Sequence, residues 1–325
     1  MRAALKRFAR RIRDTRFGMV LRKIYHTPVI YFLFNKLLKL RFGFTAVVGL
    51  EPRRASDRGP APEADQEQLR RRYRQSAEAG QEDTFVLYRI IGNDLVPRHK
   101  KGQSRENLRF ILEHEPDLQS CEKRFVLNRI IDAGEEAAVM HLLDSYGMPF
   151  IRIPFSEQEY AGRKWDLEGL PEPGYTLSKQ YDELPDDFRG RLYKRLYRHK
   201  NNYLINNNGA RNAALSDGKD RAKWVLPWDG NCFLTREAWE EIRATVTARP
   251  WYPYVIVPMA RVVDHAPILE EGFRPVADQE PQIIFRRDSD SCFDEDYYYG
   301  RRPKVEFLWR LGVPGPWDEW AIEPW

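Results

Sequence analysis

Short apolar runs alternate with amphipathic segments from residue 84 onward, and this alternation predicts strands and helices in turn. Residues 85–91, 125–131 and 150–155 are mostly apolar and have the length of buried strands. The segments between them, residues 104–115 and 139–146, carry apolar side chains at helical spacing. Three strands joined by two helices predict right-handed crossovers and therefore a parallel sheet with helices on its faces.

Residues 206–233, NNNGARNAALSDGKDRAKWVLPWDGNCF, predict a short helix that leads into a strand. The asparagines at the start are good helix caps, and Gly209 lets a ligand approach the backbone. Alanines and a leucine then favour a slim, well-packed helix. An Asp-Gly pair at 217–218 predicts the turn that ends it.

The strand that follows this helix is predicted to stop at a carboxylate. Residues 224–226 are apolar, and Pro227 is expected to end the strand because proline donates no hydrogen bond to a ladder. Asp229 then lies at the carboxyl end of the strand, where open α/β sheets bind their ligands. The alternative is an ordinary turn, since Asp229-Gly230 is also a common turn pair.

This segment resembles the core of the inverting family 2 glycosyltransferases of the GT-A fold. Ala210-Arg211-Asn212 matches the start of the family motif, and Asp229 falls on the second acid of its Asp-X-Asp element, while Pro227 replaces the first acid. The match is close over residues 206–233 and loose elsewhere. It implies a GT-A-like, Rossmann-like α/β fold with a mixed, mostly parallel sheet flanked by helices. It also implies transfer of a sugar from a nucleotide-sugar donor that Arg211 and Asn212 contact.

The resemblance further implies a divalent cation, Mn²⁺ or Mg²⁺, held by Asp229. A nucleoside diphosphate leaving group gains negative charge as the glycosidic bond breaks, and a hard cation that bridges its phosphates stabilises that charge. His265, which follows the apolar run 255–263, is a further candidate ligand. The alternative for His265 is a histidine that is merely hydrogen-bonded.

Two other segments are candidate donor-binding sites. Asn93 and Asp94 end the first predicted strand, where the GT-A fold holds the base and ribose of the nucleotide. The segment YYYGRRPK combines tyrosines with Arg301, Arg302 and Lys304, a composition that suits a diphosphate or an acidic, lipid-linked acceptor. A plain turn and a solvated surface are the respective alternatives.

An acidic segment supplies the candidate general base. The sequence DQEPQIIFR, residues 278–286, resembles the Glu-Asp segment of the same family, and alignment on Arg286 gives Glu280 as the base, with Asp278 as the fallback. An inverting transferase needs such a carboxylate to take the proton of the acceptor hydroxyl. The alternative is a pair of acids in a surface loop.

Positive charge is concentrated at the N-terminus. Residues 1–50 contain twelve Lys or Arg and one acid, a net charge of +11, whereas the whole chain has +5 and the remainder therefore −6. This basic amphipathic arm is too often interrupted by Lys and Arg to span a bilayer. It is predicted to lie on an anionic membrane surface. The alternative is a basic helix that packs on the protein itself or binds nucleic acid.

Composition divides the rest of the chain into a linker and a body. Residues 51–83 are charged and rich in Ala, Pro and Gly, which predicts a linker with a short helix at 66–75. Residues 84–325 are the expected catalytic domain, with the polar segment 156–200 as a candidate lid or insertion. The three cysteines lie far apart without Cys-X-X-Cys spacing, which disfavours a zinc or disulfide framework and favours the cytosol.

These features predict a cytoplasmic glycosyltransferase, peripherally bound to the inner membrane, that acts on a glycan or lipid-linked acceptor. Nucleic acid is not an expected partner, because the body is acidic and no recognition motif accompanies the arm. One alternative is a metal-dependent phosphotransferase or hydrolase that uses Asp229 and Asp264 and releases phosphate without transferring sugar. The other is a non-catalytic scaffold tethered to the membrane.

Overall fold

The computed structural model describes residues 64–95, 99–168, 170–172, 174–277, 279–297 and 302–320. These residues form two compact units. One is Trp165–Tyr197, and the other comprises the described parts of Pro52–Lys164 and Arg198–Ile322. The basic arm lies outside the described residues, so its membrane binding stays a prediction.

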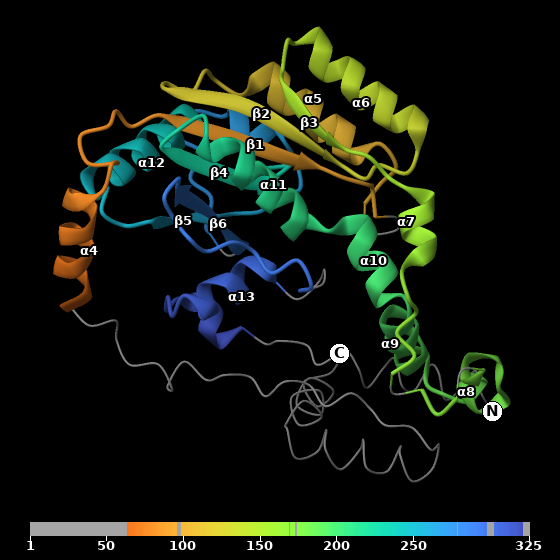
Figure 1. Cartoon of the computed structure of the whole chain (residues 1–325). Helices are drawn as coiled ribbons and strands as arrows, with labels where there is room; N and C mark the ends of the chain where they lie inside the picture. Colours follow the sequence, from red (N-terminus) through yellow and green to blue (C-terminus); the bar gives the residue numbers. More distant parts are fainter. Residues whose placement is uncertain are drawn as a thin grey trace, which may run out of the picture. The chain divides into compact units, whose positions relative to one another are not determined.

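The larger unit is built on one six-stranded sheet with the order β3-β2-β1-β4-β6-β5 (Figure 1). The strands are β1 (Phe85–Ile91), β2 (Cys121–Asn128), β3 (Phe150–Ile153), β4 (Trp224–Asp229), β5 (Tyr254–Met259) and β6 (Gln279–Arg286). Strands β1 to β4 run parallel, and β6 is antiparallel to both β4 and β5. The predicted α/β architecture with a mixed, mostly parallel sheet is confirmed.

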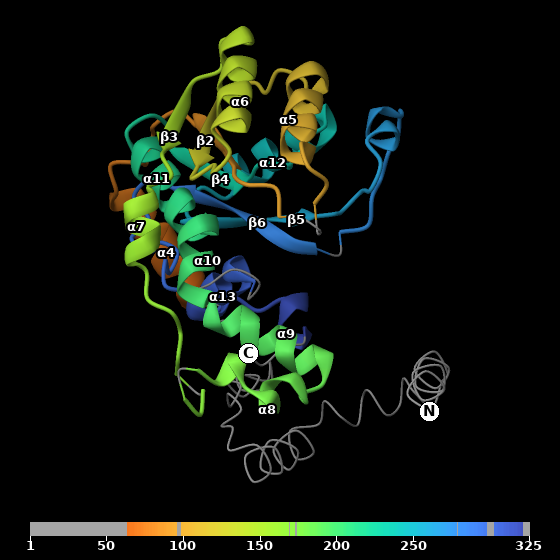
Figure 2. The ribbon, with the colours of Figure 1, turned by 90° about the vertical axis from the view of Figure 1, so that its right-hand side faces the viewer.

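Helices cover both faces of this sheet, because successive side chains of a strand point to opposite faces. One face packs against α5 (Gln103–His114), α6 (Ala133–Ser145) and α12 (Arg236–Ala248). The other packs against α11 (Asn207–Lys219) and α13 (Pro303–Arg310). Figure 2 shows α5 and α6 on the opposite side of the sheet from α13. All residues of β1 are buried, as expected for the centre of such a sheet.

Three strands differ from the prediction at their ends, and one of them, β3, ends at Ile153 and not at residue 155. Strand β2 begins at Cys121 and ends at Asn128, so its first residues are polar. Pro227 does not end β4 but lies inside it, paired with Tyr88 of β1. The ladder between β4 and β6 covers only Trp224 and Val225, so the missing N–H of Pro227 breaks no bond on that side.

Helix α11 begins as predicted and extends further. The side chain of Asn206 caps it by accepting a hydrogen bond from Gly209 N at 2.9 Å. A Cβ on Gly209 would lie 2.5 Å from the Asn206 amide nitrogen, so this glycine makes room for the cap and not for a ligand. The turn expected at 217–218 is absent, because both residues are helical and Gly218 packs directly on Val225 of β4.

The end of the predicted linker forms helix α4 (Ala64–Gln75) and contacts the sheet unit. The Lys223 Nζ donates a hydrogen bond to the Tyr73 hydroxyl at 3.1 Å, and Arg287 pairs with Glu78 at 2.8 Å. Buried charged groups therefore attach this segment to the body.

The remaining helices are short. They are α7 (Glu157–Gly162), α10 (Arg198–Ile205) and the 3-10 turns Ala266–Leu269 and Pro316–Glu319 in the sheet unit, and Tyr175–Leu177, α8 (Lys179–Asp182) and α9 (Asp186–Leu196) in the smaller one. The smaller unit has its own core around Tyr175, Phe188 and Leu192. A lid role for it stays a prediction. Among the described helices, none has the length and apolarity that a bilayer crossing requires.

Candidate functional site

A polar hollow of about 860 Å³ opens at the carboxyl ends of β1 and β4. Strand β1 lies between β2 and β4, so the chain order reverses direction at this point of the sheet. Open α/β sheets bind ligands in the crevice at such a reversal. Ile91 and Gly92 line the hollow from the β1 side, and Asp229 and Gly230 line it from the β4 side.

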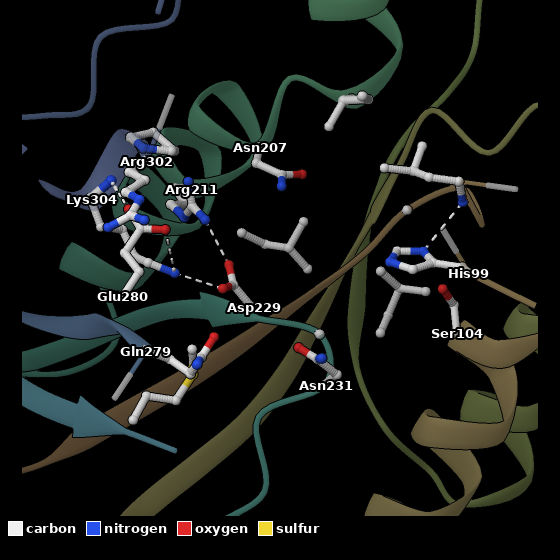
Figure 3. A pocket seen from close by; sticks show the side chains of 18 of the residues that line it. His99, Ser104, Asn207, Arg211, Asp229, Asn231, Gln279, Glu280, Arg302 and Lys304 are labelled. Carbon is white, nitrogen blue, oxygen red and sulfur yellow. Dashed lines mark hydrogen bonds and ion pairs between the residues drawn. The ribbon is translucent and has the colours of Figure 1, made fainter. Parts of the chain in front are cut away.

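Asp229 lies at the centre of an ion cluster on one wall of the hollow (Figure 3). Its Oδ1 accepts a hydrogen bond from Arg211 at 2.6 Å, and its Oδ2 accepts one from Lys304 Nζ at 2.6 Å and one from Gln282 Nε2 at 3.0 Å. Burial by itself raises the pKa of a carboxyl, but Lys304 and Arg211 outweigh it and hold the pKa of Asp229 well below its usual value. Asp229 is therefore a permanent anion paired with two cations.

Glu280 fixes the start of α13 and thereby Lys304. Its Oε1 accepts hydrogen bonds from Lys304 N at 2.8 Å and Val305 N at 3.1 Å, which satisfies backbone donors in the first turn of the helix. Its Oε2 lies 3.8 Å from Lys304 Nζ. Both residues line the hollow, so the predicted base and the cation beside it face the same space.

A buried ion pair anchors the loop that follows Asp229. Arg89 of β1 is fully buried, donates a hydrogen bond to Cys232 O at 2.8 Å and pairs with Glu115. Glu115 also accepts a hydrogen bond from Leu234 N at 2.9 Å. Arg89 and Glu115 thus hold the backbone that follows Asp229 at Cys232 and Leu234.

The two predicted metal ligands, Asp229 and His265, each have other partners in the structure. Both oxygens of Asp229 already contact cationic groups, which repel a further positive ion. The ring of His265 stacks on Phe110 at 4.2 Å. Across the part of the chain that the structure describes, no three His, Cys, Asp or Glu side chains gather as a metal site.

Other predicted donor contacts have structural roles. Asp94 accepts hydrogen bonds from Gly102 N at 2.5 Å and Ser104 Oγ at 2.7 Å at the start of α5, and it does not line the hollow. Asn212 bonds both backbone groups of Phe293 at 2.9 Å and lies outside the hollow lining. In both cases the side chain satisfies backbone groups that the fold would otherwise leave unpaired.

Asn93 and Arg302 do line the hollow. The Asn93 side chain also spans the loop after β2, donating to Arg129 O at 2.7 Å and accepting from Ile131 N at 2.8 Å. The exposed guanidinium of Arg302 lies over the Trp320 ring, 4.4 Å from its centroid. Asp278 and Arg301 lie outside the described residues.

Most of the uncharged polar residues that line the hollow are not predicted by the sequence. Gln103, Asn107, Asn207, Asn231 and Gln279 contribute to the hollow. Figure 3 shows Asn207 and Asn231 near Asp229, with His99 and Ser104 across the hollow. Nothing in the local sequence marks these amides, since they come from segments far apart in the chain and only Gln103 and Asn107 share an element, α5.

A second hollow of about 820 Å³ adjoins the first, because Asp229, Asn231 and Met259 line both. Its walls mix polar side chains with apolar ones, and the apolar ones include Phe110, Trp228, Phe233, Val257, Ile268 and Phe273. A polar hollow and a hollow of mixed lining therefore share a wall at the strand end.

No family model, curated protein or solved structure matches this chain.

Proposed function

We propose that the protein is an inverting glycosyltransferase of the GT-A type that uses a nucleotide-sugar donor. The observation that carries the proposal is the position of Asp229 between Arg211 and Lys304, on the wall of a polar hollow at the carboxyl edge of β1 and β4. Fixed cations beside a strand end suit a ligand with concentrated negative charge, such as a diphosphate. The Ala-Arg-Asn resemblance that includes Arg211 supports a sugar nucleotide as this ligand.

In this proposal Glu280 is the general base. Its Oε1 is fixed by two backbone N–H groups, and its Oε2 takes the proton of the acceptor hydroxyl. The hydroxyl oxygen attacks the anomeric carbon as the bond from that carbon to the diphosphate oxygen breaks. The electron pair of the broken bond goes to the diphosphate, where nearby cations stabilise it. No step is assigned to a divalent cation.

The acceptor is proposed to enter from the second hollow, whose lining includes apolar side chains such as Phe110, Phe233 and Phe273. That hollow adjoins the polar one at Asp229, so a molecule with an apolar part can present a hydroxyl to the reaction centre. A lipid-linked glycan has this chemistry. It agrees with the prediction that the basic arm holds the protein on the cytoplasmic side of the inner membrane.

Thermal stabilisation by a panel of nucleotide sugars tests the proposal, because a ligand that binds only the folded state raises the unfolding temperature. We expect one or a few donors to stabilise the full-length protein and to support transfer to a lipid-linked acceptor from a membrane extract. Asp229→Asn should abolish transfer. Phosphate release without sugar transfer would indicate a hydrolase or phosphotransferase, and a complete lack of stabilisation would indicate a scaffold.

A further inference from the structure

We infer that the site binds the donor diphosphate without a divalent cation and that Lys304 supplies the charge which the metal was expected to supply. This inference rests on the proposed function, because its ligand is the nucleoside diphosphate of the donor. It departs from the expectation that Asp229 is a metal ligand.

Both carboxylate oxygens of Asp229 already accept hydrogen bonds. Its Oδ2 already accepts hydrogen bonds from Lys304 Nζ and from Gln282 Nε2, and its Oδ1 accepts one from Arg211. A metal on this carboxylate would have to displace a buried ammonium or lie against two cations at short range. Hard divalent cations are usually bound by several oxygen ligands, and the neighbouring carboxylate of Glu280 already caps α13.

Lys304 and Arg211 are buried cations that line the hollow and have N–H groups to donate. Lys304 is 2% exposed, its ammonium donates one hydrogen bond among the described residues, to Asp229, and it lies 3.8 Å from Glu280 Oε2. Arg211 is equally buried, and its Nε has no acceptor among the described residues. Buried donors are normally satisfied, so donors that lack an acceptor among the described residues, on side chains that line a polar hollow, are available to a ligand with acceptor oxygens.

The charged side chains that line the hollow have a positive net charge. Four cationic side chains, Arg211, Arg261, Arg302 and Lys304, face the hollow against three carboxylates. Asp229 fixes Lys304 and Arg211 in position, and the helix cap by Glu280 fixes the backbone of Lys304. Positive charge held in advance at the reaction centre needs no reorganisation when the leaving group becomes more negative.

Titration calorimetry with inorganic pyrophosphate and with the donor panel tests the inference on the full-length protein. We expect equal affinity in EDTA and in Mn²⁺. Lys304→Met should weaken binding about tenfold or more, as expected for a lost charge-assisted hydrogen bond. Arg302→Gln should weaken it less. Arg310→Met, which removes a charge from the exposed face of α13, is the matched control and should leave affinity unchanged.

Titration with Mn²⁺ alone separates failure of the inference from failure of the function. We expect no specific Mn²⁺ binding by the wild-type protein. Mn²⁺ binding that Asp229→Asn abolishes, or pyrophosphate binding that requires Mn²⁺, overturns the inference and leaves the proposed function standing. No binding of pyrophosphate or any nucleotide sugar in either medium overturns both. If Lys304→Met fails to fold by circular dichroism, an unchanged affinity in Arg302→Gln overturns the inference.

Discussion

At the scale of single residues, Glu280 combines two roles that a substitution can separate. Glutamine keeps a carbonyl oxygen that accepts the hydrogen bonds from Lys304 N and Val305 N, but it is not a base. Glu280→Gln should therefore retain the wild-type unfolding temperature and donor affinity while kcat falls about hundredfold. Glu280→Ala should lose both the cap and turnover.

Steady-state kinetics and thermal unfolding of the two variants check this prediction. If Glu280→Gln turns over at the wild-type rate, Glu280 is a cap only. In that case Asp278→Asn becomes the test of the fallback base.

The residues of the site differ in how far the sequence predicts their positions. The sequence predicts that Asp229 and Arg211 lie near each other, because they belong to one continuous segment whose helix and strand have local sequence signals. Lys304 belonged to a predicted anion-binding segment, but its contact with Asp229 joins residues 75 positions apart. The carboxylate of Asp94 accepts hydrogen bonds at the start of α5, a tertiary contact that composition does not reveal.

At the scale of elements, the contact between α11 and β4 holds Arg211 and Asp229 in register. A Cβ on Gly218 would lie 2.5 Å from Val225 Cγ1 and 3.1 Å from the Tyr88 ring, so the helix can pack this closely only on a glycine. The predicted turn at this Asp-Gly pair was wrong because packing overrode the local preference. The Tyr88 hydroxyl bonds Asp217, which fixes the last turn of α11 to β1.

Gly218→Ala should lower the free energy of unfolding by about 1–3 kcal/mol, because overpacking outweighs the gain in helix propensity. Val225→Ala should also destabilise the protein, since it leaves a cavity. The double variant should cost less than the sum of the two single variants, because the new methyl group fills the space that valine vacates. Urea unfolding followed by circular dichroism measures all three. A stable Gly218→Ala would show that the close packing is not required.

At the scale of the whole molecule, charge is segregated between the N-terminal arm and the rest of the chain. Residues 1–50 have a net charge of +11 and the remainder has −6. An acidic body is repelled by an anionic surface, whereas each basic residue near that surface contributes about 1 kcal/mol of attraction. This asymmetry predicts that the arm alone brings the hollow to a membrane-bound acceptor.

Deletion of residues 1–50 should therefore abolish binding to anionic vesicles and leave reaction with a short soluble acceptor intact. Flotation with phosphatidylserine vesicles, and with phosphatidylcholine vesicles as the neutral control, measures the first effect. High salt should weaken binding of the full-length protein because it screens the attraction. A truncated protein that still floats with anionic vesicles would show that the anchor lies in the body, and a truncated protein that misfolds would show that the arm is part of the core.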